Sequence, residues 1–143
     1  MDSTRVRLVS SLAVGESWRS FATTTALPRF LSAKGRQSIG GQREETQFSV
    51  QLAHQAGVTI ATGTDFGGWS LPASQLAWGI ESLVAVGLAP CDAIEAAPAS
   101  GGELLGEPDA ACICEGGPAD FILIHGDPLP DPSAMWGVWR VSW

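Results

Sequence analysis

The sequence has no tyrosine, only two histidines and three cysteines. The cysteines are Cys91, Cys112 and Cys114, and they include no C-x-x-C pair. An odd number of cysteines with one C-x-C is typical of reduced intracellular thiols, and it argues against a disulfide framework. No apolar run approaches the roughly 18 residues of a membrane-spanning helix. These absences predict a cytoplasmic protein that neither spans a membrane nor depends on disulfides.

Basic residues are nearly absent from the second part of the chain. Seven of the eight lie in the first 43 positions, and only Arg140 follows, against thirteen acids. The net charge is −7, with no basic stripe, which argues against nucleic acid because its binding requires neutralisation of phosphates. Residues 1–43 are rich in Arg, Ser and Thr and loosely resemble a transit peptide. An irregular or foreign leading segment is the favoured interpretation.

The chain length sets a limit on the architecture. A chain of 143 residues has room for one domain with a hydrophobic core, and 45% of its residues are hydrophobic. It is well short of the roughly 250 residues of a complete (β/α)8 barrel. The sequence therefore predicts at most part of such a barrel.

The stretch AGVTIATGTDFGG, residues 56–68, is the most informative part of the sequence. Gly57 ends a helix, Val58 to Thr62 favour a strand, and a glycine-rich turn follows. Parallel α/β barrels keep their chemistry at the carboxyl ends of the strands. A carboxylate placed on a turn directly after a short buried strand is therefore a candidate catalytic group. That residue is Asp65.

The other helices and strands are predicted from the spacing of apolar residues and from the positions of glycine and proline. Apolar residues at helical spacing predict a helix over 44–56 and another over 73–86, each ended by a glycine. Pro90 suits the first position of a third helix, and SGGELLG predicts a short helical turn. Residues 119–125 and 138–142 predict strands. Residues 1–40 are the least readable part, with a strand in RVRLVSSLAV and then a loop with a broken helix around Pro28.

Three stretches together resemble the C-terminal part of the metal-dependent amidohydrolase superfamily, in its imidazolonepropionase and Xaa-Pro dipeptidase-like branch. AGVTIATGTDFGG is similar to the eighth barrel strand of that family and its G-T-D loop. IESLVAVGLAPCDAIEAAPASGGELLG resembles the following helix pair, and ICEGGPADFILIHGDPL resembles the return into a small β-sandwich. The match runs from about Glu44 to Val141.

The resemblance implies a role for Asp65. In that family, the aspartate after the eighth strand binds the catalytic metal, most often zinc, and moves a proton from the metal-bound water to the leaving group. A divalent cation lowers the pKa of its water to about 7, and a neighbouring carboxylate can accept and return the proton. The alternative is that Asp65 only caps a turn. Phe66, Gly67 and Gly68 could bind substrate at a pocket mouth, with loop packing as an equally favoured reading.

The sequence also departs from the family at the metal site. The family uses an H-x-H pair after the first strand, a bridging ligand in mid-barrel and two later histidines at strand ends. The two histidines here are His54, before the strand, and His125, after the barrel. Neither matches a ligand position, and they are interpreted as a helix-surface and a strand-end histidine. A zinc site needs three or four ligands, so this chain alone is expected to hold no metal.

The sequence therefore predicts an α/β protein containing the last units of an incomplete TIM-type barrel and strands of a β-sandwich. Its parts are an irregular leading segment (1–43), barrel (44–106) and sandwich strands (107–143). The function implied by resemblance is hydrolysis of C–N bonds in an amide, cyclic amide or dipeptide by metal-activated water. The alternatives are a non-catalytic interaction module, which associates with itself or with the missing barrel half, and a truncated gene product.

Overall fold

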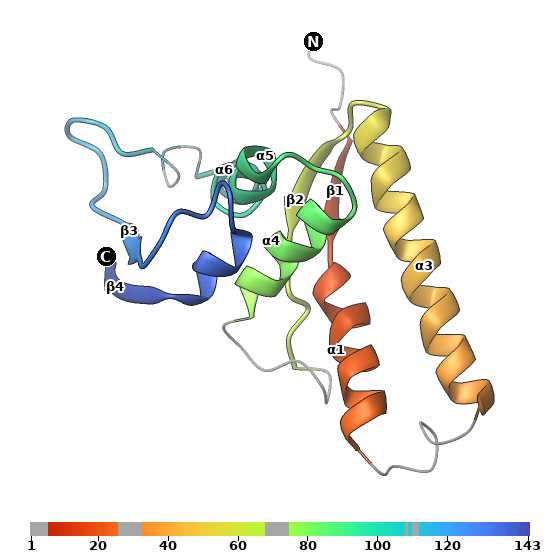
Figure 1. Cartoon of the computed structure of the whole chain (residues 1–143). Helices are drawn as coiled ribbons and strands as arrows, with labels where there is room; N and C mark the ends of the chain where they lie inside the picture. The colour runs from red at the N-terminus through yellow and green to blue at the C-terminus, as the bar shows by residue number, and fades with distance from the viewer. Residues whose placement is uncertain (1–5, 26–32, 68–74, 108, 110–111) are drawn as a thin grey trace.

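A computed structural model describes residues 6–25, 33–67, 75–107, 109 and 112–143. Its elements form two small sheets and the helices packed around them (Figure 1). In chain order the elements are β1 (Arg7–Ser10), α1 (Leu12–Thr24), α3 (Ala33–Gln55), β2 (Thr59–Thr62), α4 (Leu76–Ala85), α5 (Pro90–Glu95), α6 (Ala99–Leu105), β3 (Phe121–Ile124), the 3-10 helix η2 (Pro132–Trp136) and β4 (Val138–Ser142). The predicted α/β class is confirmed.

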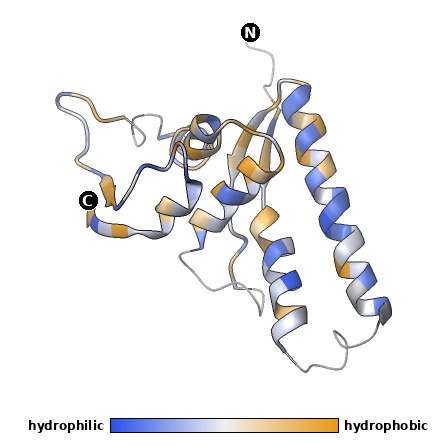
Figure 2. Cartoon of the chain, in the orientation of Figure 1, coloured by the Kyte–Doolittle hydropathy of each residue, from blue (hydrophilic) through white to orange (hydrophobic). Residues whose placement is uncertain are grey.

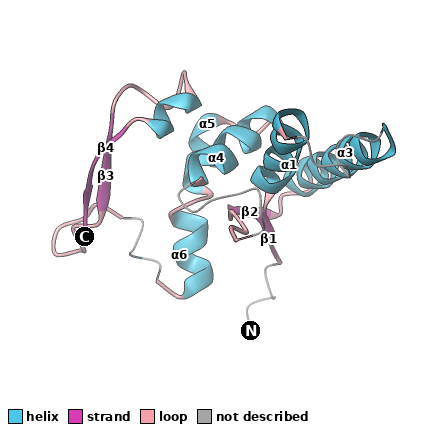
Figure 3. Cartoon of the chain, turned by 90° about the horizontal axis from the view of Figure 1, so that it is seen from below, coloured by secondary structure: helices cyan, strands magenta, loops and turns pink. Residues whose placement is uncertain are grey.

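The first sheet is a parallel pair of strands, β1 and β2. Arg7 pairs with Thr59 and Ser10 with Thr62, so both strands end at the same edge. Parallel neighbours need a crossover connection, which α1 and α3 provide here. Figure 3 shows α1, α3 and α4 on one side of the β1–β2 pair. The arrangement is that of a βαβ unit with helices on one face of its sheet.

The hydrophobic core lies between this pair of strands and the helices. Ile80 and Leu83 of α4 are the largest side chains that are fully buried. Ile60 contributes from β2, and Leu8 of β1 packs against the same cluster. The buried members of the core are Leu12, Val50, Ile60, Ile80, Leu83, Val86, Leu88, Ala93 and Ala96. Alternate residues of each strand thus face the helices.

Residues 7–24 form regular structure within the predicted leading segment. The strand predicted within residues 5–14 is present as β1, and a continuous helix, α1, covers the first part of the stretch predicted as a loop with a broken helix around Pro28. Polar side chains on the buried face of α1 hide its pattern, because Glu16 and Ser17 are almost fully buried. Glu16 accepts hydrogen bonds from Arg43 and Gln47 of α3 and from Arg19. The polar residues through which α1 contacts α3 therefore make this part of the sequence resemble a loop. Pro28 lies outside the described residues.

The helix predicted over 44–56 begins about three turns earlier, at Ala33. The added turns contain the adjacent glycines Gly40 and Gly41, and glycine weakens a helix interior. Contacts with α1 support the helix, since Arg43 and Gln47 donate hydrogen bonds to Glu16. The end of the helix is as predicted, with Gly57 in the left-handed conformation at a φ of 75°.

The helices after β2 match the sequence interpretation where they are described. α4 covers residues 76–85 of the predicted 73–86, and Gly87 follows it with a φ of 107°. Pro90 occupies the first turn of α5, and α6 is the short helix expected in SGGELLG. Searching the described residues finds no helix long and apolar enough to cross a membrane.

The second sheet is an antiparallel hairpin of β3 and β4. Ile122 pairs with Val141, and the register shifts so that Trp139 has no direct partner. The hairpin is bridged to α4 by η2, where the Trp136 indole N–H donates to Glu81 Oε1 at 2.9 Å. Both strands are largely exposed, and Figure 2 colours β3 as hydrophobic. The two predicted strands are confirmed, whereas a β-sandwich is not formed within the described residues.

Candidate functional site

The candidate site is the loop that leaves the carboxyl end of β2. The Gly63 N–H donates to the Ser10 carbonyl oxygen at 2.8 Å, which ties the loop to the end of β1. On the other side, the Thr62 N–H donates to the Ala96 carbonyl oxygen at 2.9 Å. The start of the loop is therefore held by β1 and by the end of α5.

Asp65 lies three residues beyond β2 and its side chain is exposed. Among the described residues other than glycine, Asp65 is the one with a positive φ, which is 48°. Aspartate tolerates this conformation better than most residues, because its short side chain can bond to nearby backbone. The carboxylate is thus presented to solvent at the carboxyl end of a parallel strand, as the sequence predicted. Its catalytic role stays a prediction.

The predicted substrate residues next to Asp65 are only partly described. Phe66 is 65% exposed, and Gly67 has a φ of 105°, which only glycine adopts easily. Gly68 lies outside the described residues. Phe66 and Gly67 line none of the three cavities discussed below. Their predicted contact with a substrate is untested.

Two buried hydroxyl groups lie at the ends of the paired strands, directly before the loop. Ser10 Oγ and Thr62 Oγ1 are both shielded from solvent and have no hydrogen-bond partner in the described structure. They sit opposite each other in the strand register. Gly79 of α4 lies against Thr62, since a Cβ at that position would be 2.6 Å from Thr62 Oγ1. Sequence reasoning missed this contact, because nothing in the chain order pairs these three residues.

The histidines take the positions predicted for them. His54 lies in the last turn of α3 and borders a cavity of about 200 Å³ together with Asp92 and Glu95. His125 follows β3 and contacts the Trp139 ring, with centroids 6.1 Å apart. Across the described residues, no three His, Cys, Asp or Glu side chains are close enough to hold a metal ion. Asp65 is therefore not part of such a group within the described residues.

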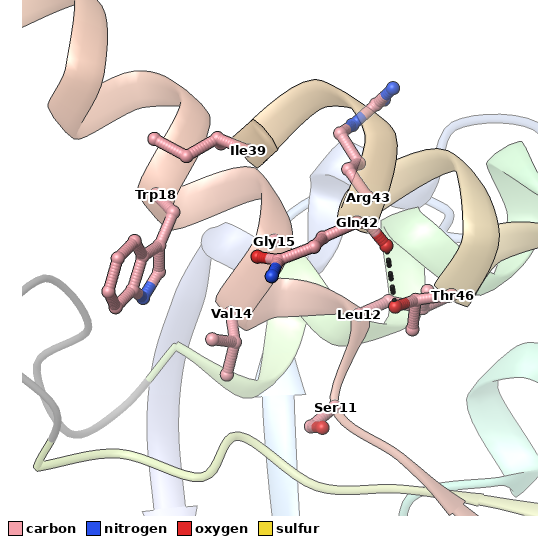
Figure 4. Close-up of a pocket in the computed structure, with 9 residues that line it drawn as sticks. All are labelled: Ser11, Leu12, Val14, Gly15, Trp18, Ile39, Gln42, Arg43 and Thr46. Atoms are coloured by element: carbon pink, nitrogen blue, oxygen red, sulfur yellow. Dashed lines mark hydrogen bonds between the residues drawn. The ribbon is translucent and has the colours of Figure 1, made fainter. Parts of the chain in front are cut away.

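A cavity of about 290 Å³ lies between α1 and α3, close to the end of β1 (Figure 4). Trp18 and Val14 border it from α1 and Ile39 from α3. The described residues lining it include no His, Cys, Asp or Glu, and the guanidinium of Arg43 points away from it.

A larger cavity, of about 580 Å³, separates α4 and α5 from the β3–β4 hairpin. Its walls are apolar, with Leu76 and Ile80 on one side and Ile122 and Val141 on the other. Asp120 is the one carboxylate among the residues that border it. The cavity marks an incompletely packed boundary between the two sheets.

Comparisons with known proteins give a clear answer for the fold. No protein-family model and no curated protein sequence matches the chain. Among solved structures, a Xaa-Pro dipeptidase with bound methionine in its active site matches 93% of the chain, with a TM-score of 0.75 and 24% identity. A chain named as a prolidase of Bifidobacterium longum matches 92% with a TM-score of 0.74 and 25% identity. An amidohydrolase matches 95% with a TM-score of 0.68 and 22% identity.

The chain thus has the fold of prolidase-like amidohydrolases. It spans about a third of their length, since it covers 32% of each of these three chains. The predicted resemblance to part of an amidohydrolase-superfamily protein is confirmed in the fold. The match covers residues that the sequence analysis had left unassigned, because 92% or more of the chain is aligned.

Proposed function

We propose that this chain provides the last part of the catalytic unit of an amidohydrolase-type hydrolase. The reaction is hydrolysis of a C–N bond in an amide, cyclic amide or dipeptide. The observation that carries the proposal is the exposed carboxylate of Asp65 at the carboxyl end of β2, in a chain with the fold of prolidase-like enzymes. Barrel enzymes place catalytic groups at this end of their strands. β1 and β2 would be neighbouring strands of the barrel, and β3 and β4 would belong to a β-sandwich.

In the complete site, Asp65 acts as one metal ligand and as the proton acceptor. Zinc is the metal that this family chemistry implies, and it requires three or four ligands. The described residues of this chain do not fit that requirement, since they place no other His, Cys or carboxylate near Asp65 in a ligand group. The isolated chain is therefore proposed to be inactive and to bind zinc weakly. The other ligands would come from the part of the fold that this chain does not span.

The test compares the isolated chain with a fusion that restores the missing part. The purified chain is expected to retain substoichiometric zinc and to release no amine from dipeptide substrates. Fused to the other two-thirds of a prolidase-like neighbour, it is expected to hydrolyse them, and Asp65→Asn is expected to lower kcat by about 10²–10⁴-fold. Asparagine keeps the size and the left-handed tendency of aspartate.

Asp127→Asn in the same fusion is the matched control. The Asp127 carboxylate accepts a hydrogen bond from the Leu129 N–H in an exposed turn after β3, so kcat should be unchanged. Stoichiometric zinc on the isolated chain, lost in Asp65→Asn, would show that it holds a metal without the missing part. An active fusion that is insensitive to Asp65→Asn would remove Asp65 from the mechanism.

A second candidate function, as an interaction module, is favoured by the free side of β1. Val9 is 56% exposed on the face of the sheet opposite the core, and the outer edge of β1 has no partner strand among the described residues. Exposed strand edges pair readily with other chains. Sedimentation velocity is expected to show self-association that increases with concentration and is weakened by Val9→Lys. Leu105→Lys, at an exposed site of α6, should leave it unchanged. A monomer at all concentrations would contradict this candidate.

A further inference from the structure

The segment between α6 and β3 contains two cysteines separated by one residue, Cys112 and Cys114. Both side chains are exposed, and Ile113 between them is 89% exposed. Residues two apart in sequence have Cα atoms at most about 7 Å apart, which overlaps the roughly 4.4–6.8 Å that a disulfide spans. Both thiols are exposed and therefore accessible to small reagents.

The local backbone holds this pair in place from both sides. The Cys112 N–H donates to the Asp109 carbonyl oxygen, and the Gly117 N–H donates to the Cys114 carbonyl oxygen, each at 3.1 Å. Gly117 also makes room for the sulfur, because a Cβ there would lie 2.7 Å from Cys114 Sγ. These backbone contacts limit how far the two cysteines can move apart.

We propose that Cys112 and Cys114 form a site of reversible oxidation, whose reaction partner is a small-molecule disulfide such as glutathione disulfide. The thiolate of one cysteine attacks a sulfur of the reagent and releases one glutathione thiolate, which takes up a proton. The thiolate of the second cysteine then attacks the mixed disulfide and releases the second glutathione. The protein loses two protons and two electrons, and the reagent gains both. This inference is independent of the proposed hydrolase function.

Cys91 provides an internal comparison. It lies on α5, and its thiol donates to Glu95 Oε1 at 3.7 Å instead of contacting another thiol. The negative charge of Glu95 raises the pKa of the Cys91 thiol. Local desolvation, followed by the neighbouring Cys112 and by Asp109, raises the pKa of Cys114 as well. Since only thiolates attack disulfides, oxidation is expected to become faster as the pH rises toward these pKa values.

Oxidation of this pair would act on the connection between the two sheets. The segment 106–120 is the covalent link between α6 and the β3–β4 hairpin. A disulfide between residues so close in sequence is strained, and strained exposed disulfides are the ones that are readily reduced. The bond is therefore expected to form in excess glutathione disulfide and to open again in a dithiol reductant.

The experiment incubates the whole chain with glutathione disulfide at pH 8 and counts thiols and intact mass. In Cys91→Ser, which removes the unpaired thiol, the free thiols are expected to fall from two to none with loss of the mass of two hydrogens, and dithiothreitol should restore both. Cleavage after Glu103 and Glu115 isolates residues 104–115, which contain both cysteines and exclude Cys91. The internal bond should be found in that peptide.

Single variants distinguish an internal bond from simple adducts. Cys91→Ser should form the internal bond like the wild type. Cys112→Ser and Cys114→Ser should each accumulate a stable glutathione adduct on the remaining cysteine, because the second attack is lost. Stable adducts on the wild-type pair, an intermolecular disulfide, or three thiols left unchanged would each overturn the proposal.

Discussion

Replacing Leu83 by alanine is expected to lower the free energy of unfolding by about 2–5 kcal/mol. Leu83 has no exposed surface and lies in the core cluster with Ile60 and Ile80. The substitution removes buried apolar contacts and leaves a cavity that the surrounding β2 and α4 residues fill only in part. The effect is a large share of the 5–15 kcal/mol that stabilises an ordinary domain. Urea unfolding followed by tryptophan fluorescence measures it as a lower midpoint.

Leu105→Ala is the matched control for Leu83→Ala. This substitution removes the same atoms at a position that is 80% exposed, at the end of α6. Surface substitutions of this kind usually change stability by less than about 0.5 kcal/mol. Equal midpoints for the two variants would mean that α4 does not pack on the β1–β2 sheet as described.

Gly79→Ala is expected to destabilise the chain by about 1–2 kcal/mol, even though alanine is the better helix former. The new Cβ would lie 2.6 Å from Thr62 Oγ1. Thr62 cannot easily move away, because β-branched side chains are stiff at χ1 and its backbone N–H is bonded to Ala96. The strain falls on the strand that carries Asp65, three residues further along the chain.

Two further variants separate the clash from helix propensity. Gly41→Ala, in α3, places a Cβ where no atom lies within 4 Å and should stabilise the chain by about 0.5–1 kcal/mol. In a Thr62→Ala background, Gly79→Ala should become neutral or stabilising, because the hydroxyl it meets is gone. The cycle is read from denaturant midpoints. A stabilising effect of Gly79→Ala in the wild type would contradict the close contact between α4 and β2.

The sequence was most informative where a single residue determines the local backbone. Gly57, Gly87 and Gly106 end helices in the left-handed region, and Pro90 begins one, so these boundaries could be predicted. The Asp65 turn could be predicted for the same reason, because its glycines follow a short strand directly. The types of these elements and the position of the candidate carboxylate could therefore be predicted from the local sequence.

The remaining features depend on contacts between distant residues. The helix α1 owes its buried polar face to Arg43 and Gln47, which lie about thirty residues away in sequence. The unpartnered hydroxyls of Ser10 and Thr62 become neighbours only when β1 and β2 pair. Intrinsic propensity cannot reveal such features, because tertiary packing decides them. The rest of the metal site could not be located for a different reason, since the described residues bring no three His, Cys, Asp or Glu side chains together.

The parallel pairing of β1 with β2 also has a consequence for how the chain acquires its structure during synthesis. β1 leaves the ribosome before β2, which follows only after roughly fifty more residues. Until then Leu8 and Val9 lack their partners on β2, and closing so long a loop is slow compared with forming a single helix or the β3–β4 hairpin. The helices of the crossover can therefore form before β1 and β2 pair. The core closes later still, because α4, which supplies Ile80 and Leu83, follows β2 in the chain.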